Sequence, residues 1–285
     1  EWGIDKPSLA PVLSAALFSL AFGALGAGPL ADRFGRKWLL IGSVTLMGAA
    51  SLASATSSNL TELEIWRFIT GLGLGGKTGL ALVLSRPYIV GTVMLWLAYF
   101  SGLVIVYGLV NWMPVLFKDA GIEPARAAVI AALFQLGGIG AIFFGYLMDR
   151  FNPNRIIATG YFLTCLAVGF IGQVVGSTPM VLAAAVFFAG LLMNTAQSSM
   201  QALAAAYYPT AGRATGVAWT LGIGRFGGIA GSFFVAELAR RHLPLPEVFL
   251  LVGIPGLVAA AALLIKNRFS PQADAPVSLK PTGAH

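Results

Sequence analysis

The stretch GPLADRFGRKWLL, residues 28–40, places four charged residues within six positions between two long apolar runs. These charges are Asp32, Arg33, Arg36 and Lys37. Anchoring at anionic lipid headgroups accounts for the three cations, but a carboxylate cannot anchor there. Ion pairing, or hydrogen bonds accepted from N–H groups at the start of a neighbouring helix, explains Asp32 better. The stretch therefore predicts a loop between two membrane spans in which the carboxylate has a specific partner.

Composition places the chain in a bilayer rather than in water. Hydrophobic residues make up 57% of the 285 residues and charged residues 10%, whereas a soluble globular domain carries about 25% charged residues. The mean hydropathy is +0.82. So few charges cannot cover the outside of a large core, and hydrocarbon suits the chain better than water does. The net charge of +7 comes from basic residues at the ends of apolar runs, which is typical of membrane proteins and argues against nucleic-acid binding.

Nine apolar runs are long enough to form membrane-spanning helices, because about 20 apolar residues cross about 30 Å of hydrocarbon. We therefore predict an all-α integral membrane protein with about nine spans. The expected spans are residues 9–31, 38–56, 63–84, 89–116, 125–148, 156–175, 180–207, 214–239 and 248–265. The third is the least regular, because Lys77 interrupts it directly after GLGLGG.

The basic residues also orient the spans, because cytoplasmic loops carry an excess of Lys and Arg. With loop 32–37 in the cytoplasm, most basic residues at span ends, including Lys266, fall on the same side, although Arg240 and Arg241 do not. We expect a multi-pass protein of the cell's inner (plasma) membrane, with loop 32–37 and the C-terminal tail cytoplasmic. The tail, residues 269–285, is rich in Pro and small residues, and we expect it to be disordered.

The loop at residues 28–37 has a second copy in the chain. GPLADRFGRK is echoed by GYLMDRFNPNR at residues 145–155, with Gly, Leu and Asp-Arg-Phe in matching places. Such a pattern is typical of transporters built from two parallel repeats. With this pair of loops the sequence resembles the major facilitator superfamily, and most closely its aromatic acid:proton symporters. The closer resemblance is carried by WGIDKPSLAPVLSAALF, LWLAYFSGLVIVYGLVNWMP and YYPTAGRATGVAWTLGIGRFGG.

The spacing of the two loops differs from that of a complete member of this family. The resemblance implies two halves of six helices each, with six helices between the loops, but only four expected spans separate them here. We infer that the chain lacks the first helix and much of helices four to six, with an internal gap near residues 76–77. The expected domains are a remnant of the N-terminal helix bundle at residues 1–76, a C-terminal six-helix bundle at 77–268 and the tail.

Arg225 is the most informative single charge. It lies about ten residues into the span that begins near residue 214, and therefore about 15 Å deep. An arginine near the midplane costs at least about 2.5–3.5 kcal/mol, so it should face a cavity or a partner. Its planar fork suits a substrate carboxylate; pairing with an acidic side chain and snorkelling along the helix are the alternatives. The other expected spans hold no acidic residue at mid-depth, which favours an anionic ligand.

Amide side chains within the spans are further candidates for a substrate path. Asn194, Gln197 and Gln201 share one helical face at i, i+3 and i+7, and amides in hydrocarbon need partners. This face either bonds a neighbouring helix or lines the path. Gln135 and Asn111 are similar but isolated.

Aromatic residues and glycines complete the pattern. Four aromatic residues of one span have two interpretations, stacking on an aromatic substrate or ordinary packing and interfacial anchoring; they are Tyr99, Phe100, Tyr107 and Trp112. The glycines around GIGRFGG, residues 222–228, need no ligand, because small residues let helices approach closely.

The resemblance implies a gating or coupling role for six charged residues. They are Asp32, Arg33 and Arg36 of the first loop, Asp149 and Arg150 of the second, and Arg67 in the R-x-x-x-G spacing of the family's fourth helix. For Arg67, an ion pair with Glu64 at i−3, worth about 0.2–0.5 kcal/mol, is an equally good account.

Together these features predict a secondary active transporter that takes up an aromatic carboxylate of the benzoate or hydroxybenzoate type with protons. The alternatives are a transporter of another small organic anion and a truncated membrane remnant that does not transport. We expect no enzyme activity, cofactor or metal, because no catalytic set of residues is visible and the two histidines and single cysteine are far apart in sequence. The expected partners are the aromatic acid, protons and the lipid bilayer, without nucleic acid, and we expect a monomer.

Overall fold

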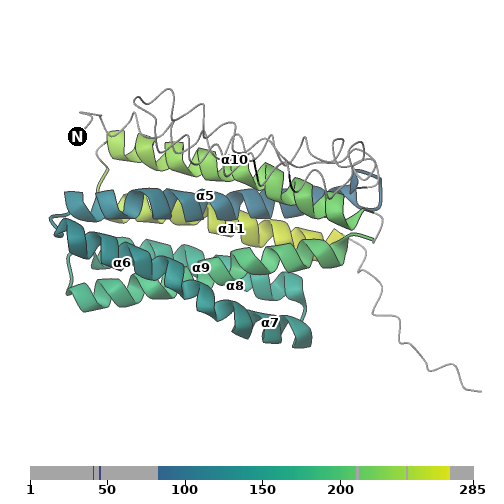
Figure 1. The fold of residues 1–285 in the computed structure, drawn as a ribbon, viewed down its shortest axis with the longest axis horizontal. Coiled ribbons are helices and arrows are strands. Elements are labelled where there is room, and N and C mark those ends of the chain that lie inside the picture. Colours follow the sequence, from purple (N-terminus) through teal and green to yellow (C-terminus); the bar gives the residue numbers. More distant parts are fainter. Residues whose placement is uncertain (1–40, 42–44, 46–82, 210–211, 242, 270–285) are drawn as a thin grey trace, which may run out of the picture.

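The chain forms long helices that lie side by side with their axes roughly aligned (Figure 1). The computed structural model describes residues 41, 45, 83–209, 212–241 and 243–269. Within these ranges six segments are long and apolar enough to cross a membrane. The elements are α5 (Ile89–Asp119), α6 (Pro124–Leu136), the 3-10 turn η2 (Gly137–Gly140), α7 (Ala141–Arg150), α8 (Pro153–Val174), α9 (Pro179–Tyr207), α10 (Arg213–Arg240) and α11 (Leu245–Phe269).

Six of the expected spans are confirmed, from the fourth to the ninth. Their ends differ from the expected ones by a few residues, because the helices continue past the apolar run into polar residues such as Lys118 and Arg240. The expected spans at 9–31, 38–56 and 63–84 lie almost entirely outside the described residues. So do the tail beyond residue 269 and the gap near residues 76–77. The total of about nine spans therefore stays a prediction.

The span expected at 125–148 is not one straight helix. It comprises α6 and α7, separated by the 3-10 turn at Gly137–Gly140. Gly137 lies directly against the backbone of Gly190 and Leu191 on α9, and a Cβ at Gly140 would come within 2.7 Å of the Thr195 hydroxyl. Three glycines in four residues weaken the helix and let α9 approach this closely.

Residues of the second loop explain why α8 begins where it does. The side chain of Asn152 accepts hydrogen bonds from the backbone N–H groups of Asn154 and Arg155, at 3.0 and 3.3 Å. Pro153 stands at the first helical position, where its missing N–H costs nothing and its fixed φ suits a helix. The segment FNPNR is therefore a helix-start signal, and the preceding Asp149-Arg150 closes α7.

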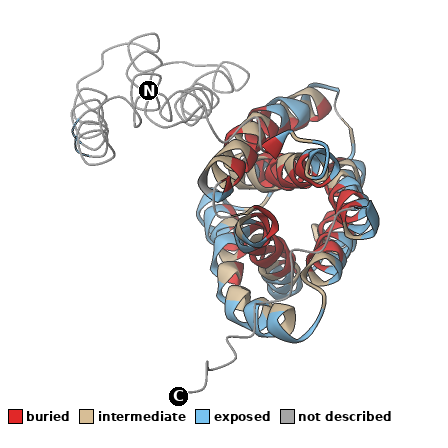
Figure 2. Ribbon diagram, turned by 90° about the vertical axis from the view of Figure 1, so that its right-hand side faces the viewer, coloured by how far each residue is buried: buried red, intermediate tan, exposed pale blue. Residues whose placement is uncertain are grey.

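Buried residues lie where the helices face one another, and exposed residues lie mostly on the outside of the bundle, as Figure 2 shows. Large apolar side chains dominate the outer face; Leu166, Phe170 and Phe188 are each more than half exposed. Such a surface is unfavourable in water and suits the hydrocarbon of a membrane. The bundle therefore presents an apolar exterior and keeps its polar groups between helices or at helix ends.

Candidate anion-binding site

Glycines on α10 bring it into close contact with α5. Gly227 and Gly231 face the backbone of Phe100 and Val104, and a Cβ at either glycine would come within 2.8 Å of the carbonyl carbon of Phe100 or the Cα of Val104. The two helices lie side by side along their length (Figure 1). The close approach predicted for the glycine-rich stretch is confirmed, and it fixes which residues of α5 can meet α10.

Two tyrosine rings of α5 fill the space left by two other glycines of α10. The ring of Tyr99 lies against Gly224 and that of Tyr107 against Gly228, where a Cβ would come within 2.6 Å of the Tyr107 ring. Tyr107 thereby reaches Arg225, whose Nη1 donates a hydrogen bond of 2.8 Å to the Tyr107 hydroxyl. A guanidinium and a phenol thus meet at the α5–α10 interface, and the ring of Tyr99 lies about two turns earlier along α5.

Arg225 lies near the middle of α10, about 18 Å from the start of the helix at 1.5 Å per residue. Its side chain is partly buried. The ion pairs found in the described part of the chain join Arg126 to Glu123, and both Arg240 and Arg241 to Glu237, at helix ends. None of them includes Arg225, so pairing with an acidic side chain is not observed among these residues. A charge placed this deep has one neutral hydrogen-bond partner in Tyr107.

A second polar contact lies inside the bundle, between α8 and α9. The hydroxyl of Tyr161, on α8, donates a 2.6 Å hydrogen bond to Oε1 of Gln197 on α9. Nε2 of Gln197 is buried and has no hydrogen-bond partner among the described residues. Gln201, one turn further along α9, is exposed. Of the predicted polar face, Gln197 therefore presents a buried amide group that lacks a partner among these residues.

The third amide does something else. Nδ2 of Asn194 donates a 2.6 Å hydrogen bond to the backbone carbonyl of Phe134, close to the end of α6. Carbonyls in the last turn of a helix lack an intrahelical partner, so this bond stabilises the break before η2. For Asn194 the structure favours the helix–helix alternative over a substrate path. Gln135, another predicted substrate contact, is exposed near the same helix end.

A third polar contact joins α5 and α10 one to two turns beyond Tyr107 and Arg225. Nδ2 of Asn111 donates a 2.9 Å hydrogen bond to the Ser232 hydroxyl, which itself donates to the carbonyl of Gly228. Sequence reasoning treated Asn111 as isolated, because its partner lies 121 residues away in the chain. The same helix pairing gives Tyr107 its contact with Arg225, which no local pattern indicated.

The predicted gating residues lie apart from this interface or outside the described residues. Asp149 and Arg150 are exposed at the C-terminal end of α7, where the Arg150 guanidinium stands 4.7 Å from the centroid of the Tyr146 ring. Asp32, Arg33, Arg36 and Arg67 are not among the described residues. Their gating or coupling roles stay predictions.

Lys266 forms an unexpected cluster at the end of α11. Its side chain is only 4% exposed; Nζ donates a 2.9 Å hydrogen bond to Oδ1 of Asn154 and lies 4.4 Å from the centroid of the Tyr207 ring. The Tyr207 hydroxyl donates to the carbonyl of Tyr88, at 3.0 Å. One cation thus ties α8, α9 and α11 together beside the start of α5.

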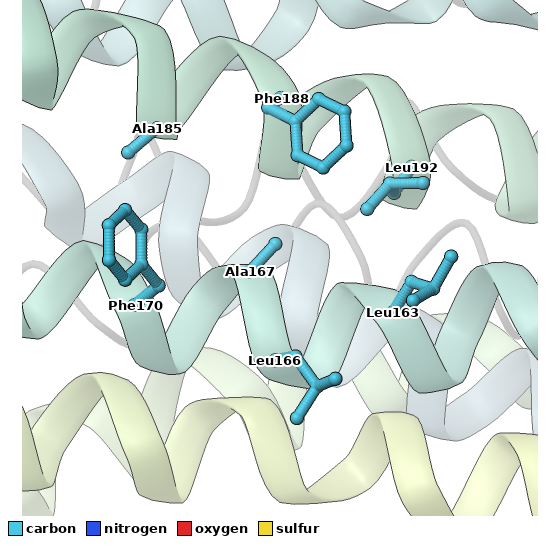
Figure 3. A pocket seen from close by; sticks show the side chains of 7 residues that line it. All are labelled: Leu163, Leu166, Ala167, Phe170, Ala185, Phe188 and Leu192. Atoms are coloured by element: carbon cyan, nitrogen blue, oxygen red, sulfur yellow. The ribbon is translucent and has the colours of Figure 1, made fainter.

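An apolar groove of about 560 Å³ lies on the outer face of the bundle, between α8 and α9 (Figure 3). Its lining consists of Leu163, Leu166, Ala167, Phe170, Ala185, Phe188 and Leu192. None of these side chains offers a hydrogen bond to a carboxylate, and several are exposed to the surroundings of the bundle. The groove therefore suits lipid, and the polar cluster at Arg225 is the better candidate for binding an anion.

Sequence comparison identifies the family. The sequence model of the Major Facilitator Superfamily matches residues 95–284, which is more than half of the chain. This chain belongs to the major facilitator superfamily. A second model, for sugar and other transporters, matches residues 6–85. With six membrane-length helices in the described part, the membership makes it a multi-pass membrane protein, and its family and relatives are transporters.

Curated relatives within the superfamily are transporters of aromatic acids. The chain is 35% identical to the 4-hydroxybenzoate transporter PcaK of Pseudomonas aeruginosa, covering 96% of this chain and 87% of that protein. It is 32% identical to the gallate transporter of Pseudomonas putida, covering 97% and 88%. It is 29% identical to the 3-(3-hydroxy-phenyl)propionate transporter of Escherichia coli, covering 96% and 89%. The resemblance to the aromatic acid transporters is confirmed.

The length of these alignments bears on the expected internal gap. The comparison with PcaK extends over 392 residues, whereas the chain has 285. The alignment must therefore leave more than 100 positions of the relative unmatched within the aligned region. That these positions correspond to helices missing near residues 76–77 stays a prediction.

Proposed function

We propose that this chain is a secondary active transporter that takes up an aromatic carboxylate together with protons. The observation that carries the proposal is Arg225, a mid-span guanidinium with a phenol as its hydrogen-bond partner and no carboxylate partner among the described residues. The names of the relatives supply the substrate class, since 4-hydroxybenzoate, gallate and hydroxyphenylpropionate each combine an aromatic ring with a carboxylate.

A carboxylate satisfies the physical requirements of Arg225. Its two oxygens match the planar fork of the guanidinium, and the charge-assisted bonds between them are about twice as strong as neutral ones. Outside water these interactions strengthen, because the surrounding dielectric is lower. Tyr99 and Tyr107 add apolar ring faces beside the cation, where an aromatic substrate can pack. Gln197 adds a buried Nε2 that has no hydrogen-bond partner among the described residues.

Transport by this superfamily rests on alternating access, in which two bundles rock about a site near the midplane. We propose that residues 77–268 form one bundle and that residues 1–76 contribute to the other. In this scheme the loops with Asp32, Arg33 and Arg36 and with Asp149 and Arg150 hold one of the two access states. We place the protein in the plasma membrane as a monomer, with both loops and the tail in the cytoplasm.

A second candidate is a membrane remnant that binds its ligand but does not transport. The positions that the relatives have and this chain lacks favour it, because a rocking mechanism needs two complementary bundles. A transporter of another small organic anion is a third candidate, since Arg225 would accept any carboxylate.

Uptake of radiolabelled 4-hydroxybenzoate into proteoliposomes tests the proposal. The purified chain is reconstituted, and an inward proton gradient is imposed with and without a protonophore. Gradient-dependent uptake that the protonophore abolishes supports symport. A chimera that carries the corresponding internal segment of PcaK serves as the matched control. Uptake by the chimera alone supports the remnant, and preference for a non-aromatic acid supports the third candidate.

A further inference from the structure

The hydrogen bond between Arg225 and Tyr107 has a defined direction. A guanidinium only donates, so in the 2.8 Å contact the Tyr107 oxygen is the acceptor. A phenol carries a single proton, and that proton takes no part in this bond. No second hydrogen bond of the Tyr107 hydroxyl is found among the described residues, so this proton can be donated to a ligand of Arg225.

We propose that the hydroxyl of Tyr107 donates a hydrogen bond to the bound anion, so that Arg225 and Tyr107 together form a site composed of donors only. The inference rests on the proposed function, since it takes Arg225 as the carboxylate-binding residue. It adds a basis for specificity: an ionised carboxylate accepts at both oxygens, whereas the NH₂ group of the matching amide meets no acceptor. An unmet buried polar group is costly, so the site selects the acid over its neutral amide.

Substitution of Tyr107 by phenylalanine tests this specificity. Binding of 4-hydroxybenzoate and of 4-hydroxybenzamide is measured on the purified full chain by calorimetric titration. A hydrogen bond to a charged group is worth about 10- to 100-fold in affinity, so Tyr107→Phe should weaken acid binding by about that factor. Amide binding should stay the same or improve. Tyr208→Phe is the matched control, because it removes another buried hydroxyl, one that donates to Thr92.

The ratio of amide to acid affinity separates a donor from a structural role. If Tyr107 only positions Arg225, both ligands weaken together and the ratio stays constant, which would overturn the inference. Acid binding equal to that of the wild-type chain in Tyr107→Phe would also overturn it. Succinate is titrated in parallel. Tighter binding of succinate than of 4-hydroxybenzoate would contradict the aromatic substrate, while the succinate affinity of Tyr107→Phe would still test whether Tyr107 donates to a carboxylate.

Discussion

Nη1 of Arg225 on α10 lies 2.8 Å from the hydroxyl oxygen of Tyr107 on α5, and the two residues are 118 positions apart in the chain. The contact exists because Gly228 leaves room for the tyrosine ring, so helix packing and the hydrogen bond to Arg225 depend on the same short stretch of α10.

The first prediction follows from the shape of the arginine. Arg225→Lys keeps the charge and loses the fork, so the apparent KM for 4-hydroxybenzoate should rise by about tenfold. Initial uptake rates in proteoliposomes measure it. An unchanged KM would exclude two-point binding, and Arg126→Lys, at an exposed helix start, is the control.

The close contact at the glycines of α10 predicts that a larger residue there lowers the stability of the protein. Gly227→Ala places a methyl group against the backbone of Phe100, which cannot move aside as a flexible side chain would. Overpacking of this kind costs about 1–3 kcal/mol, so the thermal unfolding midpoint in detergent should fall by several degrees. Gly145→Ala is the matched control, because a Cβ there meets nothing within 4 Å. Equal midpoints for the two variants would show that the helices are not in close contact.

The buried hydrogen bond between Lys266 and Asn154 predicts that substitutions of these two residues have non-additive effects on stability. Asn154→Leu removes the oxygen that accepts from Nζ and leaves a buried ammonium facing only the Tyr207 ring. An uncompensated buried charge is strongly destabilising, and we expect a loss of about 2–3 kcal/mol. Adding Lys266→Met to Asn154→Leu removes the charge and should recover most of the loss. Unfolding midpoints of the two single variants and the double variant measure the coupling. Additive effects would show that the two side chains do not interact.

The expected role of the first loop predicts that a substitution at Asp32 slows transport without weakening substrate binding. Asp32→Asn removes the carboxylate that we expect to hold one access state, without changing any residue of the α5–α10 interface. Turnover in proteoliposomes should fall, while the Kd for 4-hydroxybenzoate stays close to that of the wild-type chain. Arg268→Gln, at the end of α11, removes another exposed charge and should leave turnover unchanged. Normal turnover in Asp32→Asn would contradict the latch.

Hydropathy was sufficient to predict the six described spans, because crossing hydrocarbon demands a long apolar helix whatever its neighbours are. It could not predict the break at Gly137–Gly140, which depends on how closely α9 approaches. It also assigned Lys266 to the row of basic residues at span ends, whereas the structure buries its side chain against Asn154 and Tyr207. Side-chain burial near a helix end depends on the neighbouring helices, and the sequence does not say which helices are neighbours.

The candidate site divides in the same way. The importance of Arg225 could be predicted from the sequence, because a charged residue in the middle of an apolar span is costly and so indicates a binding partner. Its contact with Tyr107 could not be predicted, since it arises from the pairing of α5 with α10. Of the periodic face, Asn194 and Gln197 make contacts with neighbouring helices, whereas Gln201 is exposed. Asn194 bonds the carbonyl of Phe134, and Gln197 bonds Tyr161. These partners belong to other helices, so the periodicity of α9 alone could not identify them.

Equilibrium binding of 4-hydroxybenzoate to the wild-type chain and to Arg225→Gln tests the central claim most directly. Glutamine keeps a polar side chain of similar reach but loses the charge and the paired donors. The account predicts saturable binding by the wild-type chain and affinity at least about tenfold weaker in the variant. The variant should keep its unfolding midpoint within a few degrees, which would show that the fold is intact. Equal affinity of the two proteins would contradict the assignment of Arg225 as the residue that binds the carboxylate.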